Sequence, residues 1–225
     1  DYENFKTGLI EQASELGYLD AKFIENTVDV YQDQFYADIS LHFDTGVRYK
    51  IEKINIKQTP DFLRDDFILK FVTVKKDKYF TNSELFKLRK TLASTGYFEH
   101  ISIELDYENR NKGMIPLIID VTPGDRIKYS TGIGFSTDTG PRMTFDYSQS
   151  RVSDFGYQFN SKLSLSNVIS ELITGLKMPS KSNPLNKWYN VEAGYRIERT
   201  DTVSSNTTKI GLSQTRIQQN KSQNI

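Results

Sequence analysis

The sequence predicts α+β repeats, each ordered strand, helix, helix, strand, strand, followed by the first strands of a transmembrane antiparallel β-barrel. Two observations predict this fold: a segment recurs within the first 124 residues, and apolar and polar residues alternate strictly after Gly124. In addition, no apolar run approaches the ~20 residues that a membrane-spanning helix needs. The expected divisions are residues 1–46 (the later part of one repeat), 47–124 (a complete repeat) and 125–225 (about six barrel strands).

Two landmarks recur at nearly the same spacing. The segment SELGYLD around Gly17 returns as ASTGYFE around Gly96, and DTGVR around Gly46 returns as TPGDR around Gly124. The first pair of glycines is 79 residues apart and the second pair 78. This indicates a repeated module of roughly 75–80 residues.

Local signals place the elements of the complete repeat. Thr81 and Glu84 form a T-x-x-E capping box at the start of its second helix, and Gly96 ends that helix as a left-handed residue. Strands are expected over 48–58, 100–107 and 115–121, with a first helix over 61–72. The incomplete repeat keeps a helix over 2–16 and a hairpin formed by 22–32 and 34–43.

After Gly124 the charges occupy one face of each of the four clear alternating segments. Clear strands are expected at 127–136, 142–148, 157–166 and 189–198, and weaker ones at 172–178 and 208–216. A charged side chain facing lipid costs ~2–4 kcal/mol at the bilayer midplane, whereas a barrel lumen tolerates it. The aromatic residues expected near the membrane interfaces are Tyr129, Tyr147, Trp188 and Tyr189.

The turns between these strands are expected to differ in length. Asp154–Gly156 predicts a tight turn, and 199–207 predicts a longer polar turn. A soluble β-sandwich explains the same alternation equally well on pattern alone. About six strands are also fewer than the roughly eight of the smallest membrane barrels, so the chain is either part of a barrel or not a barrel.

Residues 1–124 resemble the POTRA repeat (polypeptide-transport-associated repeat), through the element order and the helix-Gly-Tyr-aromatic junction. The stretch GIGFSTDTGPR at 132–142 resembles the first barrel strand and loop of the TamA family, the outer-membrane subunits of the translocation and assembly module within the BamA/TamA superfamily. Segment 177–185 resembles the turn between the fourth and fifth strands of that family, and 199–201 resembles the end of the fifth strand. The resemblance implies three POTRA repeats and a sixteen-stranded barrel. A signal peptide and about one more repeat are then expected upstream, with roughly ten more strands downstream.

The resemblance implies an outer-membrane factor that inserts β-barrel proteins such as autotransporters by strand templating at a lateral gate. The implied gate strand contains Ile127, Tyr129, Thr131, Gly132, Ile133, Gly134 and Phe135. The implied family loop contains Asp138, Gly140, Pro141 and Arg142. By analogy with other POTRA domains, the docking edge of the complete repeat contains His100, Ile101, Ser102, Ile103, Glu104, Leu105 and Asp106.

The expected partners are a TamB-like protein anchored in the inner membrane, unfolded outer-membrane proteins and outer-membrane lipid. The formal net charge is zero and the chain has no cysteine, so nothing points to nucleic acid or a thiolate site. No catalytic constellation or cofactor motif stands out, and we expect no enzyme activity. The alternatives are a BamA-like general assembly factor, a two-partner secretion transporter, or a soluble periplasmic binding scaffold with a β-sandwich.

Overall fold

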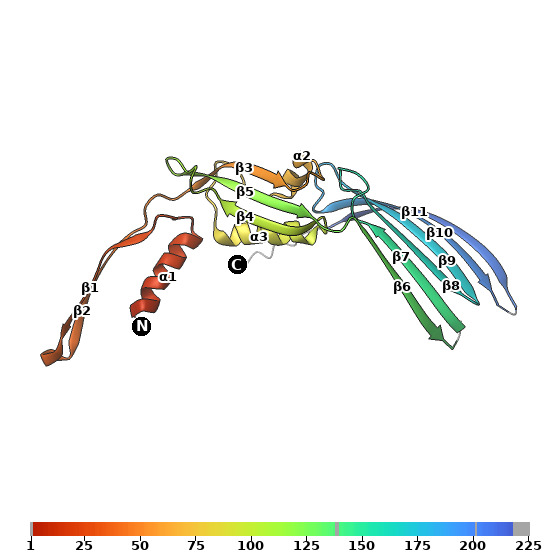
Figure 1. Ribbon diagram of the computed structural model, residues 1–225, viewed down its shortest axis with the longest axis horizontal. Helices are drawn as coiled ribbons and strands as arrows, with labels where there is room; N and C mark the ends of the chain where they lie inside the picture. Colours follow the sequence, from red (N-terminus) through yellow and green to blue (C-terminus); the bar gives the residue numbers. More distant parts are fainter. Residues whose placement is uncertain (1, 138–139, 201, 218–225) are drawn as a thin grey trace. The chain divides into compact units, whose positions relative to one another are not determined.

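The computed structural model describes residues 2–137, 140–200 and 202–217 (Figure 1). The chain forms two compact units, and each draws on separate stretches of the sequence. The first unit contains 1–57, 73–91 and 101–120, and the second contains 58–72, 92–100 and 121–225. The repeat predicted over 47–124 therefore contributes segments to both units.

The incomplete repeat has the predicted helix and hairpin. Helix α1 (Tyr2–Glu15) is followed by β1 (Lys22–Tyr31) and β2 (Tyr36–Asp44), which form a two-stranded antiparallel sheet. A short 3₁₀ turn, η1 (Gln32–Gln34), joins the two strands. The hairpin turns at Phe35, whose φ of 52° lies in the left-handed region.

The complete repeat has the predicted order of strand, helix, helix, strand, strand. Its elements are β3 (Lys50–Gln58), α2 (Asp65–Ile68), η2 (Leu69–Phe71), α3 (Asn82–Ser94), β4 (Phe98–Leu105) and β5 (Met114–Pro123). The strands form a sheet with the order β3-β5-β4, so β4 lies at an edge. Side chains without solvent exposure include Ile51 of β3, Leu88 of α3 and Ile115 of β5.

The capping box predicted at Thr81 is present. The backbone N–H of Glu84 donates to Thr81 Oγ1 at 3.1 Å, and the N–H of Thr81 donates to Glu84 Oε2 at 3.0 Å. These two bonds satisfy N–H groups that have no partner inside the helix. Gly96, at φ +74°, follows the helix as expected.

The helix predicted over 61–72 is shorter than expected, with α2 covering only Asp65–Ile68 and η2 continuing to Phe71. The side chain of Gln58 explains the late start. Its Oε1 accepts the backbone N–H of Leu63 at 3.1 Å, and its Nε2 donates to the Leu63 carbonyl at 2.7 Å. These bonds satisfy the backbone of Leu63 outside a helix.

The second half forms a six-stranded antiparallel sheet in which each strand pairs with its neighbours in sequence (Figure 1). The strands are β6 (Ile127–Ser136), β7 (Gly140–Gln149), β8 (Gln158–Ser166), β9 (Ile169–Pro179), β10 (Lys187–Arg199) and β11 (Ser204–Arg216). The four clear and two weaker predicted segments are all strands. The predicted fold class is therefore confirmed, since this sheet matches barrel strands of known structure, as described below.

Of the two predicted turns, the longer one over 199–207 was wrong, and the tight one at Asp154–Gly156 is present. Strand β11 begins at Ser204, because residues 204–207 pair with 196–199 of β10, and only 200–203 connect the strands. Residues 150–157 connect β7 and β8, and within them the backbone N–H of Gly156 donates to the Ser153 carbonyl at 3.1 Å, which closes the predicted tight turn. The polar residues at 204–207 resemble turn residues in sequence, but cross-strand pairing holds them in the ladder.

Candidate membrane-facing sheet and strand edge

The strand register assigns every residue of the six-stranded sheet to one of two faces. In an antiparallel ladder, residues directly opposite each other point to the same side. One row across the sheet contains Thr131, Phe145, Leu163, Leu172, Tyr195 and Thr208. The adjacent row contains Ile133, Met143, Leu165, Ser170, Ile197 and Asn206. These rows lie within one largely apolar face, which we call the apolar face.

Several large side chains on the apolar face are mostly exposed within the described residues. Ile133 is 88% exposed, Ile210 78% and Leu212 79%. A contiguous apolar surface of this kind marks contact with a membrane or another protein. Burying an aliphatic side chain of this size stabilises by ~1.5–3 kcal/mol, so lipid in contact with this face is strongly favoured over water.

Charged side chains gather on the opposite face, which we call the polar face. By the same register they are Lys128, Arg142, Asp146, Lys162, Glu171, Lys177, Glu192, Arg196, Glu198 and Lys209. Within the described strands, the apolar face carries charges only at strand ends, at Lys187, Arg199 and Arg216. This is the separation of charge that a transmembrane barrel requires.

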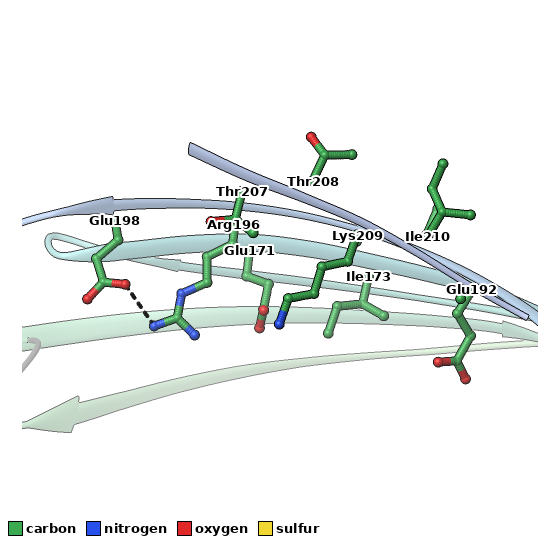
Figure 2. Close-up of a pocket in the computed structure, with 12 residues that line it drawn as sticks. Glu171, Ile173, Glu192, Arg196, Glu198, Thr207, Thr208, Lys209 and Ile210 are labelled. Atoms are coloured by element: carbon green, nitrogen blue, oxygen red, sulfur yellow. Dashed lines mark hydrogen bonds and ion pairs between the residues drawn. The ribbon is translucent and has the colours of Figure 1, made fainter. Parts of the chain in front are cut away.

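An open hollow of about 840 Å³ lies on the polar face of β9, β10 and β11. Figure 2 shows the side chains of Glu171, Arg196 and Lys209 on one side of the sheet, with Thr208 and Ile210 on the other. Arg196 Nη2 lies 3.1 Å from Glu198 Oε2. Charges of both signs, half-exposed and close together, are typical of a hydrated lumen.

Trp188 lies on the polar face, so its predicted position in a lipid-facing aromatic girdle was wrong. It shares the side of β10 that carries Asn190, and Lys177 Nζ lies 4.1 Å from its ring centroid. Only 9% of Trp188 is exposed. Adjacent strand residues point to opposite faces, so neighbouring Tyr189 does lie on the apolar face.

Strand β6 is the edge proposed for templating. Within the described residues it pairs with β7 and lies at one edge of the six-stranded sheet. The apolar face of this strand carries Ile127, Tyr129, Thr131, Ile133 and Phe135, and the polar face carries Gly132 and Gly134. An exposed strand edge of this kind accepts an additional strand through main-chain hydrogen bonds.

The two glycines of β6 have different surroundings. A Cβ at Gly132 would lie 2.8 Å from Thr144 Oγ1, so this glycine relieves packing against the neighbouring strand. A Cβ at Gly134 would meet nothing within 4 Å. Packing therefore explains why position 132 is a glycine. It does not explain the glycine at position 134, where a side chain would fit.

The residues of the family-like loop lie at the start of β7. Gly140 has φ +72° and pairs with Ser136, Pro141 pairs with Phe135, and Arg142 points to the polar face. Asp138 lies outside the described residues. The structure thus places Gly140, Pro141 and Arg142 in the β6–β7 hairpin.

The predicted docking edge of the repeat coincides with most of β4, although the strand runs from Phe98 to Leu105 rather than over 100–107. His100 and Glu104 are exposed, and Ile101 is buried. Asp106 lies beyond the strand, where its side chain accepts hydrogen bonds from Asn109. The other residues of this edge, Ser102, Ile103 and Leu105, are half-buried.

Within the described residues, no helix is long and apolar enough to span a membrane. In the same part of the chain, no group of His, Cys, Asp and Glu side chains could hold a metal ion.

Comparisons with known proteins agree with this geometry. Residues 49–124 match the family model described as "POTRA: Surface antigen variable number repeat". The chain is similar to BamA from Haemophilus ducreyi lacking POTRA domains 1–3, with 13% identity, a TM-score of 0.75, and coverage of 94% of this chain and 40% of that one. It is also similar to CdiB from Acinetobacter baumannii, with 11% identity, a TM-score of 0.53, and coverage of 96% and 41%.

The structure of CdiB from Escherichia coli gives nearly the same result, with 11% identity, a TM-score of 0.52, and coverage of 95% and 39%. The chain thus spans about 40% of the length of these structures. At such identities the likeness concerns the fold. Residues 49–124 thus match a POTRA model, and the fold of the chain resembles that of the BamA structure, including strands of its barrel.

Proposed function

We propose that this chain is part of a non-enzymatic outer-membrane factor that assembles or secretes other proteins. Its POTRA repeats lie in the periplasm and β6–β11 cross the outer membrane. One observation supports this most strongly: the six-stranded sheet has an apolar face without internal charges, opposite a face that carries the charged side chains. The POTRA match and the BamA-like and CdiB-like fold support the same class of function.

The mechanism follows from the cost of unpaired backbone groups in lipid. Each unpaired N–H or C=O costs several kcal/mol in hydrocarbon, so an incoming strand needs partners before it enters the bilayer. The edge of β6 supplies these partners whatever the side-chain sequence of the client. Because Gly134 has no side chain, the β6 edge is less covered near the end of the strand. A Cβ there would meet nothing within 4 Å.

The more specific proposal is a TamA-like factor that inserts autotransporters and works with a TamB-like protein anchored in the inner membrane. It is supported by the sequence similarity of the β6–β7 hairpin, from Gly132 to Arg142, to the TamA family. The edge strand β4, with exposed His100 and Glu104, is the surface proposed for a periplasmic partner. A BamA-like general assembly factor is the alternative within the same class.

Disulfide crosslinking in cells expressing the whole protein tests the template. A cysteine replaces Thr131 on β6, or Thr174 on the interior strand β9 as a matched control, since both threonines lie on the apolar face. A stalled autotransporter carries single cysteines along its last barrel strand. Crosslinks at Thr131→Cys in one register, and none at Thr174→Cys, are expected. Equal crosslinking at both positions, or at neither, contradicts templating at β6.

Secretion through the lumen is a second candidate, supported by the CdiB-like fold and the charged hollow on the polar face. In that case a translocating chain passes along Glu192 and Lys209. A cysteine at Glu192 then crosslinks to many positions of a secreted client, whereas Thr131→Cys does not. The same set of variants therefore distinguishes strand addition from passage through the lumen.

A further inference from the structure

The helix-Gly-Tyr corner, found in the sequence as a recurring landmark, has a precise set of contacts in the complete repeat. Tyr97 follows Gly96 and has no exposed surface. Its hydroxyl donates a hydrogen bond of 2.7 Å to the carbonyl of Gly156, in the connection between β7 and β8. The backbone N–H of Gly124 donates to the Tyr97 carbonyl at 3.0 Å. Tyr97 thus joins its own repeat to the β7–β8 connection of the sheet.

Other bonds hold the same β7–β8 connection, residues 150–157, against 58–72 and 92–100 of the repeat. The backbone N–H of Arg64 donates to the Asp154 carbonyl at 3.3 Å, and the Arg64 guanidinium lies 5.0 Å from the Phe155 ring centroid. Near the start of the connection, the Arg151 guanidinium lies 4.7 Å from the centroid of the Phe62 ring. The attachment is therefore distributed along the connection.

Gly156 fits this junction because it has no side chain. Its φ is +71°, and a Cβ there would lie 2.6 Å from ring atoms of Phe67 and 2.8 Å from the Tyr97 hydroxyl. Phe67 and Tyr97 themselves pack edge to face, with centroids 5.8 Å apart. Any larger residue at position 156 would have to displace one of these buried rings.

The corresponding corner of the incomplete repeat also contacts the module that follows it. The N–H of Tyr49 donates to the Gly17 carbonyl at 3.0 Å, and a Cβ at Gly17 would lie 3.0 Å from the Phe80 carbonyl oxygen. Asp20 accepts the Tyr49 hydroxyl at 2.6 Å and Arg110 Nη1 at 2.7 Å. Both copies of the landmark are therefore junctions, although their partners differ.

We propose that the Gly-Tyr corner is the docking element of each repeat, and that in the complete repeat it clamps the β7–β8 connection. A displacement of the corner is then passed to β7 and β8, next to the β6 edge. This role follows from the contacts alone and does not depend on strand templating. It is a coupling between a periplasmic repeat and the sheet, made by Tyr97 and Gly156.

Paired spin labels in the whole protein, refolded in liposomes, test the clamp. Labels at Lys70→Cys on η2 and Lys181→Cys in the β9–β10 connection report the distance between the repeat segment and the sheet; both positions are exposed. The parent protein is expected to give a single distance population. Gly156→Ala is expected to add a second population, because the new methyl group forces the rings apart. Tyr97→Phe is expected to do so less, because it removes only the hydroxyl.

Two substitutions serve as matched controls. Gly211→Ala adds a methyl group where nothing lies within 4 Å, and Tyr107→Phe removes a hydroxyl from an exposed tyrosine of the same repeat. Both should leave the single population unchanged. Hydrogen exchange at 150–157 should become ~2- to 10-fold faster in Tyr97→Phe, as expected for loss of one hydrogen bond.

The proposal is overturned if Tyr97→Phe leaves both the distances and the exchange of 150–157 unchanged. If Gly156→Ala prevents folding, detected as loss of heat-modifiable gel mobility, the Tyr97→Phe result decides alone. A change of the same size in Tyr107→Phe or Gly211→Ala also overturns it, since the effect would not then be specific to the junction.

Discussion

Placing a charge at Leu163 tests the assignment of the apolar face to lipid. Leu163 lies near the middle of β8, directly opposite Phe145 on β7 and Leu172 on β9. Leu163→Lys therefore places an ammonium group within the apolar face. Ser164→Lys is the matched control, because the adjacent residue points to the polar face, which already carries Lys162 in the same strand.

The expected difference follows from the cost of a cation near the bilayer midplane. A lysine facing lipid there destabilises a barrel by ~2–4 kcal/mol, whereas one in the lumen is tolerated. Each 1.36 kcal/mol is a factor of ten in an equilibrium constant, so Leu163→Lys should lower the folding equilibrium by ~30- to 900-fold. Ser164→Lys should change it by only a few-fold, since surface substitutions are usually within ~0.5 kcal/mol.

Urea titration of the whole protein in liposomes provides the measurement, with folded protein quantified by heat-modifiable gel mobility. The midpoint should fall for Leu163→Lys and stay near the parent value for Ser164→Lys. Equal midpoints for the two variants would refute the assignment. In a soluble sandwich Leu163 would lie in a protein core, where a lysine would also be destabilising. A spin label at Phe145 or Val191 separates these two cases. High oxygen accessibility is expected at both positions if the apolar face contacts lipid.

Three further predictions concern the repeats. Thr81→Ala should destabilise α3 by ~0.5–2 kcal/mol through loss of the capping box, measured by hydrogen exchange of that helix. Asp20→Asn should lower stability by about 1 kcal/mol or less, because Arg110 is partly exposed, and thermal melts should show no comparable loss for exposed Asp33→Asn. Burial raises the pKa of Tyr97, so its stabilising contribution is complete below the unfolded pKa of about 10 and is lost as pH rises through the higher folded value. Melts between about pH 8 and 11 should show this loss in the parent but less in Tyr97→Phe.

The elements that follow from local rules were predictable from the sequence. The capping box at Thr81 and the αL residue Gly96 depend on neighbours within a few positions. The strands of the second half were predictable because alternation of period two, with charges on one side, is repeated in successive segments. The faces of β7 and β8 followed directly, since Phe145 and Leu163 share one side with their apolar neighbours.

Features that depend on particular side chains or pairings were not predictable. The late start of α2 depends on the Gln58 amide, and the strand character of 204–207 depends on pairing with β10. Trp188 lies one position from Tyr189, yet strand geometry sends it to the opposite face. The role of the β7–β8 connection was also missed, because the only local sign is Gly156, which equally predicts a simple turn.

The recurring corner also bears on how such chains change length. The same Gly-Tyr motif contacts a second repeat in one place and a strand connection in the other, through Gly17 and Tyr97 respectively. A duplicated repeat would therefore already contain the residues that attach it to the next segment. That segment would need only a compatible surface. Tandem duplication can lengthen the periplasmic array without inventing a new attachment each time.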